Sequence, residues 1–306
     1  MTVVCGPAAW NHLIRLDRLP EPVPHMQFAT GSSYAVGGTS AGKAVHLTAL
    51  GVPLELHTLL GADEAGDRVR AALTRAGVAL HAYASNDSEQ HVNLMTDDGE
   101  RISLYVSVPS EPDASTLDAA LAALREARVA VVDLSGFGAA LLPRIAALPA
   151  PPPVWTDLHD YDGRAGFHEP FLRAAEVVFM NDDAVGGELD AAWDLLASCV
   201  ARGPQLAVCT RGAAGAIALD TAGKRYEVAA VPVDVVDTNG AGDGFFAGFL
   251  AAALSAGSAG GARRTGGAGE GSGRSLAELD VGRCLAAGAA QAAVALGSTA
   301  MHPLLG

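Results

Sequence analysis

Residues 231–250 read VPVDVVDTNGAGDGFFAGFL. An apolar, strand-like run ends at Thr238, glycines follow at Gly240 and Gly242, and an apolar helix begins near Asp243. Glycines at a strand-to-helix turn let several backbone N–H groups point at one spot, and the positive end of the helix dipole lies at the same place. The stretch therefore predicts an anion site suited to a polyphosphate or to a phosphoryl group in transfer.

Asp243 is the carboxylate of this turn. In the first helical turn it would lie beside the anion, where it could accept a proton from an attacking hydroxyl. The alternative is a glycine-rich turn in which the aspartate only caps the helix. A dinucleotide fingerprint would need a third glycine at position 245, and that residue is Phe245.

Composition limits the partners. The chain has 306 residues, with 20 Lys+Arg against 34 Asp+Glu and a formal net charge of −14. Nonspecific binding to nucleic acid or to an anionic membrane needs a basic surface, so we expect neither. No apolar run is long enough to span a membrane, and the first residues do not resemble a signal peptide. Four cysteines outside any CxxC pair indicate buried thiols and a reducing, cytoplasmic setting.

Short apolar runs alternate with Ala/Leu-rich helical stretches along most of the chain. This βα rhythm predicts a doubly wound, mostly parallel sheet with helices on both faces. Strands are expected at 54–59, 129–132, 154–156, 177–180 and 206–210, and helices at 41–50, 64–76, 116–126, 190–201, 243–254 and 276–296.

Two segments interrupt the rhythm. Residues 26–36 and 90–108 are extended and half polar, and the second contains Asp98-Gly99, a hairpin signal. The insertions that hold them span about 12–36 and 90–108. They predict a small β-sheet that acts as a lid on a single domain spanning residues 1–306. Residues 255–275 are rich in Gly, Ser and Arg and predict a flexible surface loop.

The stretch Asp237–Asp243, DTNGAGD, resembles the DTxGAGD signature of the ribokinase/PfkB carbohydrate kinase family. The resemblance extends over nearly the whole chain and implies a ribokinase-like fold with a β-sheet lid. It also implies ATP-dependent phosphorylation of an alcohol, such as a hydroxymethyl group, on a sugar or sugar-like substrate. ATP and Mg²⁺ would be the cofactors, with K⁺ as a further candidate.

The same resemblance implies roles for individual residues. Asp243 would be the catalytic base, and the amides of Gly240, Ala241, Gly242 and Asp243 would form the anion hole. Asn11 falls where the family has a sugar-binding aspartate, and Gly37-Gly38 would let the substrate approach the backbone. The nucleotide would contact Asn181, Thr210, Gly212, Gly215, Asp237, Thr238 and Gly242. Asp237, Thr238 and Ser298 would border the monovalent cation.

The chain departs from the family pattern at two positions. Gly42 stands where the family commonly has a sugar-contacting asparagine after the glycine pair. In the family's NxxE motif Asn181 matches, but Ala184 replaces the glutamate, with Asp182 and Asp183 nearby. These departures concern sugar preference and magnesium handling, and they leave Asp243 unaffected.

Three further residues are candidates for substrate binding. Residues 37–44 nearly form a P-loop, but Ala44 replaces the hydroxyl residue that would bind Mg²⁺. Lys43 is therefore interpreted as a helix-start residue near the substrate pocket. Asp157 and His159 follow an expected strand, and ligands bind at strand ends in doubly wound sheets. A polar loop with an aspartate cap is the equal alternative. A metal cluster is disfavoured, because no histidine pair in the sequence has metal-ligand spacing.

Three other functions remain open from the sequence. A nucleoside kinase would share the chemistry but would need an apolar, base-sized slot beside Asn11. A noncatalytic sugar- or nucleotide-binding regulator would have the same fold without turnover, and a Rossmann dehydrogenase would bind NAD(P). Because lid strands often pair with another copy, a homodimer is also expected.

Overall fold

The computed structural model describes residues 1–96, 99–255 and 279–305. The predicted loop at 255–275 lies outside the described residues from 256 onward. No described helix is long and apolar enough to cross a membrane.

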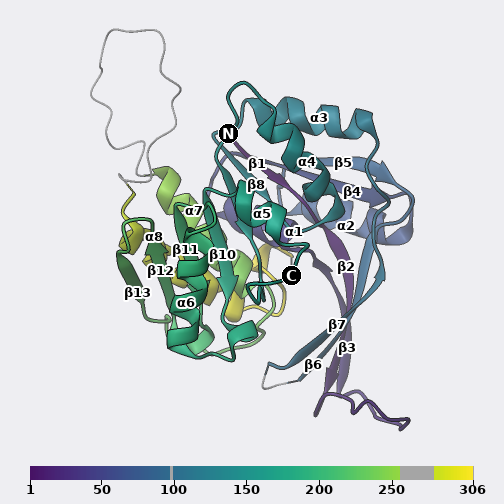
Figure 1. The fold of residues 1–306 in the computed structure, drawn as a ribbon. Helices are drawn as coiled ribbons and strands as arrows, with labels where there is room; N and C mark the ends of the chain where they lie inside the picture. The colour runs from purple at the N-terminus through teal and green to yellow at the C-terminus, as the bar shows by residue number, and fades with distance from the viewer. Residues whose placement is uncertain (97–98, 256–278, 306) are drawn as a thin grey trace, which may run out of the picture.

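A nine-stranded sheet forms the centre of the molecule (Figure 1). Seven neighbouring strands are parallel, and a β-hairpin adds two antiparallel strands at one edge. In sheet order the strands are β13 (Arg225–Val228), β12 (Ala216–Asp220), β11 (Leu206–Thr210), β10 (Val177–Asn181), β9 (Val154–Asp157), β8 (Val129–Val132), β1 (Thr2–Cys5), β4 (Leu54–Gly61) and β5 (Leu80–Ser85).

Helices cover both faces of this sheet, which buries the apolar runs on two sides and explains why the central strands are almost entirely apolar. One core contains side chains of α1 (Thr39–Ala49), α2 (Glu64–Arg75), α7 (Ala241–Ser255) and α8 (Val281–Leu296). The other contains side chains of α3 (Ala114–Arg125), α4 (Gly136–Ala146), α5 (Glu169–Ala174) and α6 (Leu189–Val200). The doubly wound architecture is confirmed.

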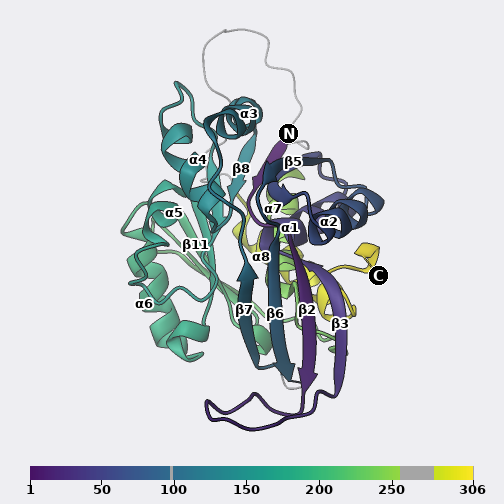
Figure 2. The ribbon, with the colours of Figure 1, turned by 90° about the vertical axis from the view of Figure 1, so that its right-hand side faces the viewer.

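The four-stranded small sheet projects from the large one, as Figure 2 shows. Its order is β3 (Gly31–Gly37), β2 (Ala9–Leu16), β6 (Glu89–Thr96) and β7 (Arg101–Ser107). β2 pairs in parallel with β6, while the two outer pairs are antiparallel. The separate small sheet expected from the sequence is confirmed, and its first strand begins at Ala9, directly after β1.

Two local expectations were wrong. The run 231–236 forms no strand, and Val235 and Val236 are exposed, with Val236 donating one backbone hydrogen bond to Leu296. The last helix begins at Val281 rather than at 276, because Asp280 caps it by accepting a hydrogen bond from the Arg283 amide. The alternating apolar residues of 231–236 resemble those of a strand, and the residues just before Val281 resemble those of a helix. Local sequence alone therefore did not separate either segment from a regular element.

Candidate active site

The glycine-rich turn leads directly into α7. Gly240 has a φ of 80°, and a Cβ there would lie 2.9 Å from Cβ of Met301, so this position requires glycine. A Cβ at Gly242 would meet no atom within 4 Å. The amides of Gly242 and Asp243 lie in the first turn of α7, where the helix itself supplies no acceptor. The turn thus presents amide donors beside open space.

Asp243 is buried at this helix start, with 8% of its surface exposed. Its Oδ1 lies 3.1 Å from Nζ of Lys43, which comes from α1. Burial raises the pKa of Asp243 to about 6, an effect that the Lys43 ammonium opposes and that nearby carboxylates reinforce. At neutral pH the carboxylate is therefore mostly ionised and poised to take a proton.

Lys43 lies at the centre of a buried charge cluster. Its ammonium is 3.3 Å from Asp133 Oδ1 and 3.4 Å from Asp157 Oδ2, in addition to Asp243, and its side chain is fully buried. Burial alone would lower the pKa of Lys43, but the three carboxylates raise it above its ordinary value. A buried ammonium of this kind stays charged because carboxylates surround it. We call Lys43, Asp133, Asp157 and Asp243 the charge cluster.

Asp133 and Ser40 are members of the site that sequence reasoning missed. Asp133 follows β8 and accepts a 2.7 Å hydrogen bond from Ser40 Oγ. The signal was available, since Asp133 follows an apolar strand as Asp157 ends one, and carboxyl ends of parallel strands meet at one edge. The contact with Ser40, which is 93 positions away in sequence, carries no local signal.

Asp157 and His159 lie together at the end of β9. The backbone amide of His159 donates a 2.9 Å hydrogen bond to Asp157 Oδ1, and His159 has a φ of 54°, which is uncommon for a residue with a side chain. Burial would raise the pKa of Asp157, but His159 and Lys43 bring it below its ordinary value. Asp157 is therefore an ionised partner of Lys43 rather than an isolated loop carboxylate.

Gly42 explains how Asp243 comes so close to α1. A Cβ at Gly42 would lie 2.4 Å from Asp243 Oδ2, which is too close for the carboxylate to stay in place. The departure from the family asparagine therefore makes room for the Lys43–Asp243 ion pair.

The family resemblance implies that Asp243 is the catalytic base, so we expect Gly42→Ala to lower kcat/KM about 100-fold, because a shift of an ångström in a reacting group has effects of this size. Gly136→Ala is the matched control, since a Cβ on this helical glycine would meet nothing within 4 Å. Steady-state kinetics of both variants provide the measurement. A Gly42→Ala enzyme as active as Gly136→Ala would contradict the steric argument.

Asn11 and the glycine pair lie where the small sheet joins the body. Asn11 is buried on β2, and a Cβ at Gly37 would lie 2.0 Å from its Nδ2. Gly38 has a φ of 88°, and a Cβ there would lie 2.5 Å from the Pro7 carbonyl oxygen. Both glycines therefore serve close packing against the chain after β1, whatever their contact with a substrate.

The residues expected to contact the nucleotide lie at the ends of β10 and β11. Asn181 and Thr210 are paired in the register of these parallel strands. Gly212 and Gly215, with φ values of 51° and 89°, form the turn after β11. In addition, Arg211 binds Asp182 at 3.1 Å, which ties the two strand ends together.

Asp237 has a partner that the sequence did not indicate. Arg15, at the far end of β2, forms an ion pair with the buried Asp237 carboxylate, which also accepts a 2.8 Å hydrogen bond from the Asn239 amide. Ser298, just after α8, accepts a hydrogen bond from the Ala300 amide through its Oγ. The small sheet is thus bound directly to the turn that precedes α7.

The structure therefore brings Lys43, Asp157 and Asp243 into direct contact, and it adds Asp133 and Ser40. The other predicted residues lie at neighbouring strand ends, at the base of the small sheet, in the turn before α7 and just after α8. A cavity of about 830 Å³ beside Arg128 and Pro153 lies at the opposite, amino-terminal ends of the strands and is not this site.

Known proteins with similar sequences and structures show which family the chain belongs to. Residues 3–302 match the pfkB family carbohydrate kinases. An acarbose 7(IV)-phosphotransferase from Actinoplanes sp. is 32% identical over 255 residues, which cover 81% of this chain and 83% of that protein. The solved structure of a microbiome-derived acarbose kinase has a TM-score of 0.77 at 28% identity, covering 98% of this chain and 93% of the other.

A ribokinase from Giardia lamblia has a TM-score of 0.80 at 14% identity, covering 98% of this chain and 95% of the other, and it supports the fold alone. The α/β fold together with these matches defines a phosphotransferase. The chain belongs to the pfkB family of carbohydrate kinases. It is an ATP-dependent enzyme that phosphorylates a hydroxyl group of a sugar or sugar-like substrate.

Proposed function

We propose that Asp243 is the catalytic base and that the amides of Gly240, Ala241, Gly242 and Asp243 form the anion hole. A substrate hydroxymethyl oxygen would lose its proton to the Asp243 carboxylate as it attacks the terminal phosphoryl group of ATP. The observation that carries this proposal is the position of Asp243. Its carboxylate is buried in the first turn of α7, beside free helix amides and within 3.1 Å of a buried ammonium.

The amides would act by electrostatics. Donors fixed before the reaction begins stabilise charge that develops on the phosphoryl oxygens without reorganising. Mg²⁺, when bound with ATP, neutralises charge on the phosphates. At the strand end that carries Asn181, Asp182 is already paired with Arg211, whereas Asp183 is exposed and forms no ion pair with another described residue. Asn181 and Asp183 are therefore the residues we propose to orient magnesium in place of the missing glutamate.

The buried face of the small sheet is the proposed sugar-binding surface. Asn11 and Asn93 lie on the same face of neighbouring strands, with 4% and 3% exposure. The Oδ1 atom of each has no hydrogen-bond partner among the described residues. Buried amide oxygens need donors, and sugar hydroxyls would supply them. We propose that the small sheet is a lid, part of a single domain spanning residues 1–306, and that it binds hydroxyls of the substrate.

The positive charge beside Asp237, which a monovalent cation was expected to supply, comes from Arg15. The Asp237 carboxylate is already neutralised by the Arg15 guanidinium, so the donor set of Asp237, Thr238 and Ser298 does not fit K⁺ while this pair is formed. We expect wild-type activity to change less than about twofold when K⁺ is replaced by a bulky organic cation. Arg15→Gln should make activity depend on K⁺, whereas Arg18→Gln, on the exposed connection, should not. Strong K⁺ activation of the wild type would contradict this.

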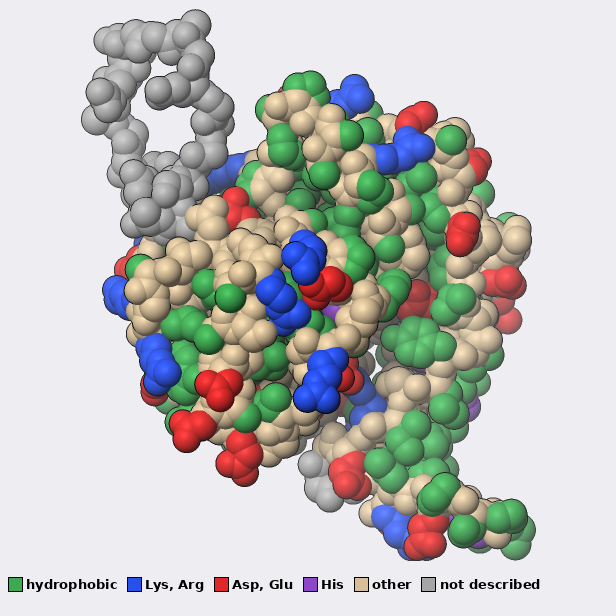
Figure 3. Space-filling view, viewed as in Figure 1, with side chains coloured by type: hydrophobic (Ala, Val, Ile, Leu, Met, Phe, Trp, Pro, Cys, Tyr) green, Lys and Arg blue, Asp and Glu red, His purple; other side chains and the backbone are tan. Residues whose placement is uncertain are grey.

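Exposed apolar side chains support a homodimer through the small sheet. Tyr34 on β3 and Leu104 and Val106 on β7 are 60%, 50% and 64% exposed. Figure 3 shows hydrophobic side chains gathered over this region at the lower right. Exposed apolar side chains on edge strands favour pairing with another copy. Sedimentation equilibrium should give twice the chain mass, and a monomer at micromolar concentration would contradict the proposal.

A cytoplasmic setting is also proposed. All four cysteines, Cys5, Cys199, Cys209 and Cys284, are buried and unpaired. Free thiols of this kind suit a reducing compartment.

A coupled ADP-release assay against a substrate panel tests the proposed function. The panel holds acarbose, hexoses, pentoses, polyols and nucleosides, because relatives include two enzymes named for acarbose. We expect ADP release with one sugar or sugar-like class, and ³¹P NMR should show a phosphomonoester at a hydroxymethyl carbon. Preference for nucleosides would favour the nucleoside kinase. Binding without ADP release for every compound would favour a noncatalytic regulator.

A further inference from the structure

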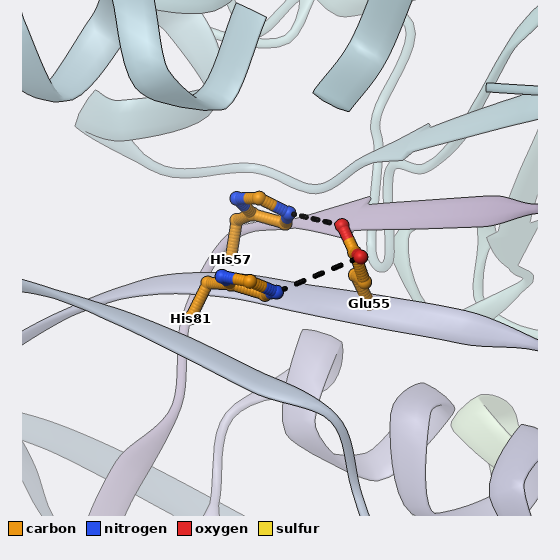
Figure 4. Close-up of side chains that lie close together, drawn as sticks. All are labelled: Glu55, His57 and His81. Atoms are coloured by element: carbon orange, nitrogen blue, oxygen red, sulfur yellow. Dashed lines mark hydrogen bonds and ion pairs between the residues drawn. The ribbon is translucent and has the colours of Figure 1, made fainter. Parts of the chain in front are cut away.

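A cluster of two histidines and one glutamate lies on the edge of the large sheet, away from the proposed active site. Glu55 and His57 are two positions apart on β4, so their side chains leave the same face of the strand. His81 on β5 is the direct register partner of His57. Figure 4 shows both histidine rings beside Glu55, each with one nitrogen turned toward a different oxygen of its carboxylate.

The distances between the donor atoms approach those of a metal site. His57 Nε2 is 3.3 Å from Glu55 Oε2, and His81 Nε2 is 3.7 Å from Glu55 Oε1. One donor atom from each residue lies within 4.8 Å of the others. Zn²⁺ bonds of about 2.0–2.2 Å place tetrahedral donors roughly 3.3–3.5 Å apart. Small side-chain rotations would therefore bring all three donors to one ion.

A fourth residue orients the buried histidine. The hydroxyl of Tyr83, which follows His81 by two positions on β5, is 2.8 Å from His57 Nδ1. The two imidazole rings are stacked, with centroids 4.6 Å apart and an interplanar angle of 10°. In metal sites the second ring nitrogen of a histidine ligand is held by such a partner, which fixes the direction of the first. Here Nε2 of His57 is the nitrogen left facing Glu55.

The space between the three side chains can be reached from solvent. The His57 side chain is 2% exposed, that of Glu55 25% and that of His81 49%. The buried His57 ring would therefore hold the ion in place, and the ion would enter from solvent on the side of the exposed His81 ring. Its fourth coordination position would be open to water. Two imidazoles and one carboxylate suit Zn²⁺ or a neighbouring transition metal, whereas Mg²⁺ prefers oxygen donors.

The cluster lies on the other side of the sheet from the charge cluster. Leu59, on the same face of β4 as Glu55 and His57, packs in the core covered by α3 to α6. Leu56 points the other way and packs with the helices that carry Lys43 and Asp243. An ion here would join edge strand β5 to β4 without touching the proposed reacting groups.

We propose that Glu55, His57 and His81 form a binding site for one zinc-class divalent transition-metal ion that stabilises the β4–β5 edge. The site is independent of the proposed kinase chemistry.

Calorimetric titration of the EDTA-treated, dialysed full chain with Zn²⁺ tests this proposal. We expect one ion per chain with a dissociation constant of about 10 µM or tighter, and a Tm higher by about 3 °C or more in saturating Zn²⁺. Co²⁺ should give the visible absorption of a low-coordinate site. Glu55→Gln and His81→Ala change partly exposed side chains, so they should fold normally and weaken binding at least 10-fold. Tyr83→Phe should weaken it about 10-fold.

His25→Ala is the matched control, because His25 is an exposed histidine on the connection between β2 and β3. It should bind Zn²⁺ as the wild type does. Binding that is unchanged in both Glu55→Gln and His81→Ala would overturn the proposal, as would a wild-type dissociation constant above about 1 mM.

Discussion

Replacing Asp243 with asparagine is expected to lower turnover by roughly 10²–10⁴-fold or more, because a positioned base contributes at least this much to proton transfer. Asparagine has nearly the same volume and can still accept a hydrogen bond from Lys43. The amides of the α7 turn are unchanged, so ATP binding should be retained within a few fold. The effect should therefore appear in kcat rather than in the KM for ATP.

The measurement is a steady-state comparison of Asp243→Asn with Asp194→Asn, an exposed aspartate on α6. Circular dichroism and Tm values should show that both variants fold. Near-normal turnover in Asp243→Asn would remove the base assignment. Equal losses in both variants would point to a fault in folding rather than in chemistry.

Replacing Lys43 with methionine is expected to have the largest effect on stability. It would leave the carboxylates of Asp133, Asp157 and Asp243 buried without their shared cation. Removing one partner from a buried ion pair costs about 3–5 kcal/mol of unfolding free energy. Denaturant unfolding of Lys43→Met should show this loss. Lys224→Met, at the only other lysine, changes a residue on the surface and should lie within about 0.5 kcal/mol of the wild type.

The same lysine should set the pH range of activity. Because the base works when ionised, kcat/KM of the wild type should rise with pH through about 6, the pKa of Asp243. Without the Lys43 ammonium, which lowers that pKa, the carboxyl should ionise only at higher pH. Lys43→Gln, which keeps polar hydrogens at the position, should therefore move the acid limb upward, even if Lys43→Met is too unstable to assay. An unmoved acid limb would show that Lys43 does not act on the base.

The regular elements could be read from sequence where their pattern is local. The strand at Val129–Val132 has the predicted bounds, because an uninterrupted apolar run between polar segments has few alternatives. The run 231–236 also looks apolar, but it pairs with no strand and is exposed. Propensity allows a strand there, and whether one forms depends on tertiary contacts that the local pattern does not carry.

Some features of the candidate site could likewise be read from local sequence, and others could not. The turn at Gly240 and Gly242 was evident from glycine spacing before a helix. By contrast, Lys43 was expected at a helix start near the pocket, and the structure places its whole side chain inside the charge cluster. The Arg15–Asp237 pair joins residues 222 positions apart, and no local pattern signals such a contact.

The metal-binding proposal illustrates the same limit. His57 and His81 are 24 positions apart in the sequence, and they become neighbours only because β4 pairs with β5.

The sequence alone thus determined the α/β class, the small sheet and the glycine-rich turn before α7, because strand periodicity, helix starts and glycine turns are properties of contiguous residues. Tertiary structure decided which charges meet. Lys43 lies on α1, Asp133 after β8, Asp157 at the end of β9 and Asp243 on α7. They come together because β1 lies between β8 and β4, which brings the strand ends and both helices to one place. A buried ammonium with three carboxylates depends on that convergence and cannot be read from any single segment.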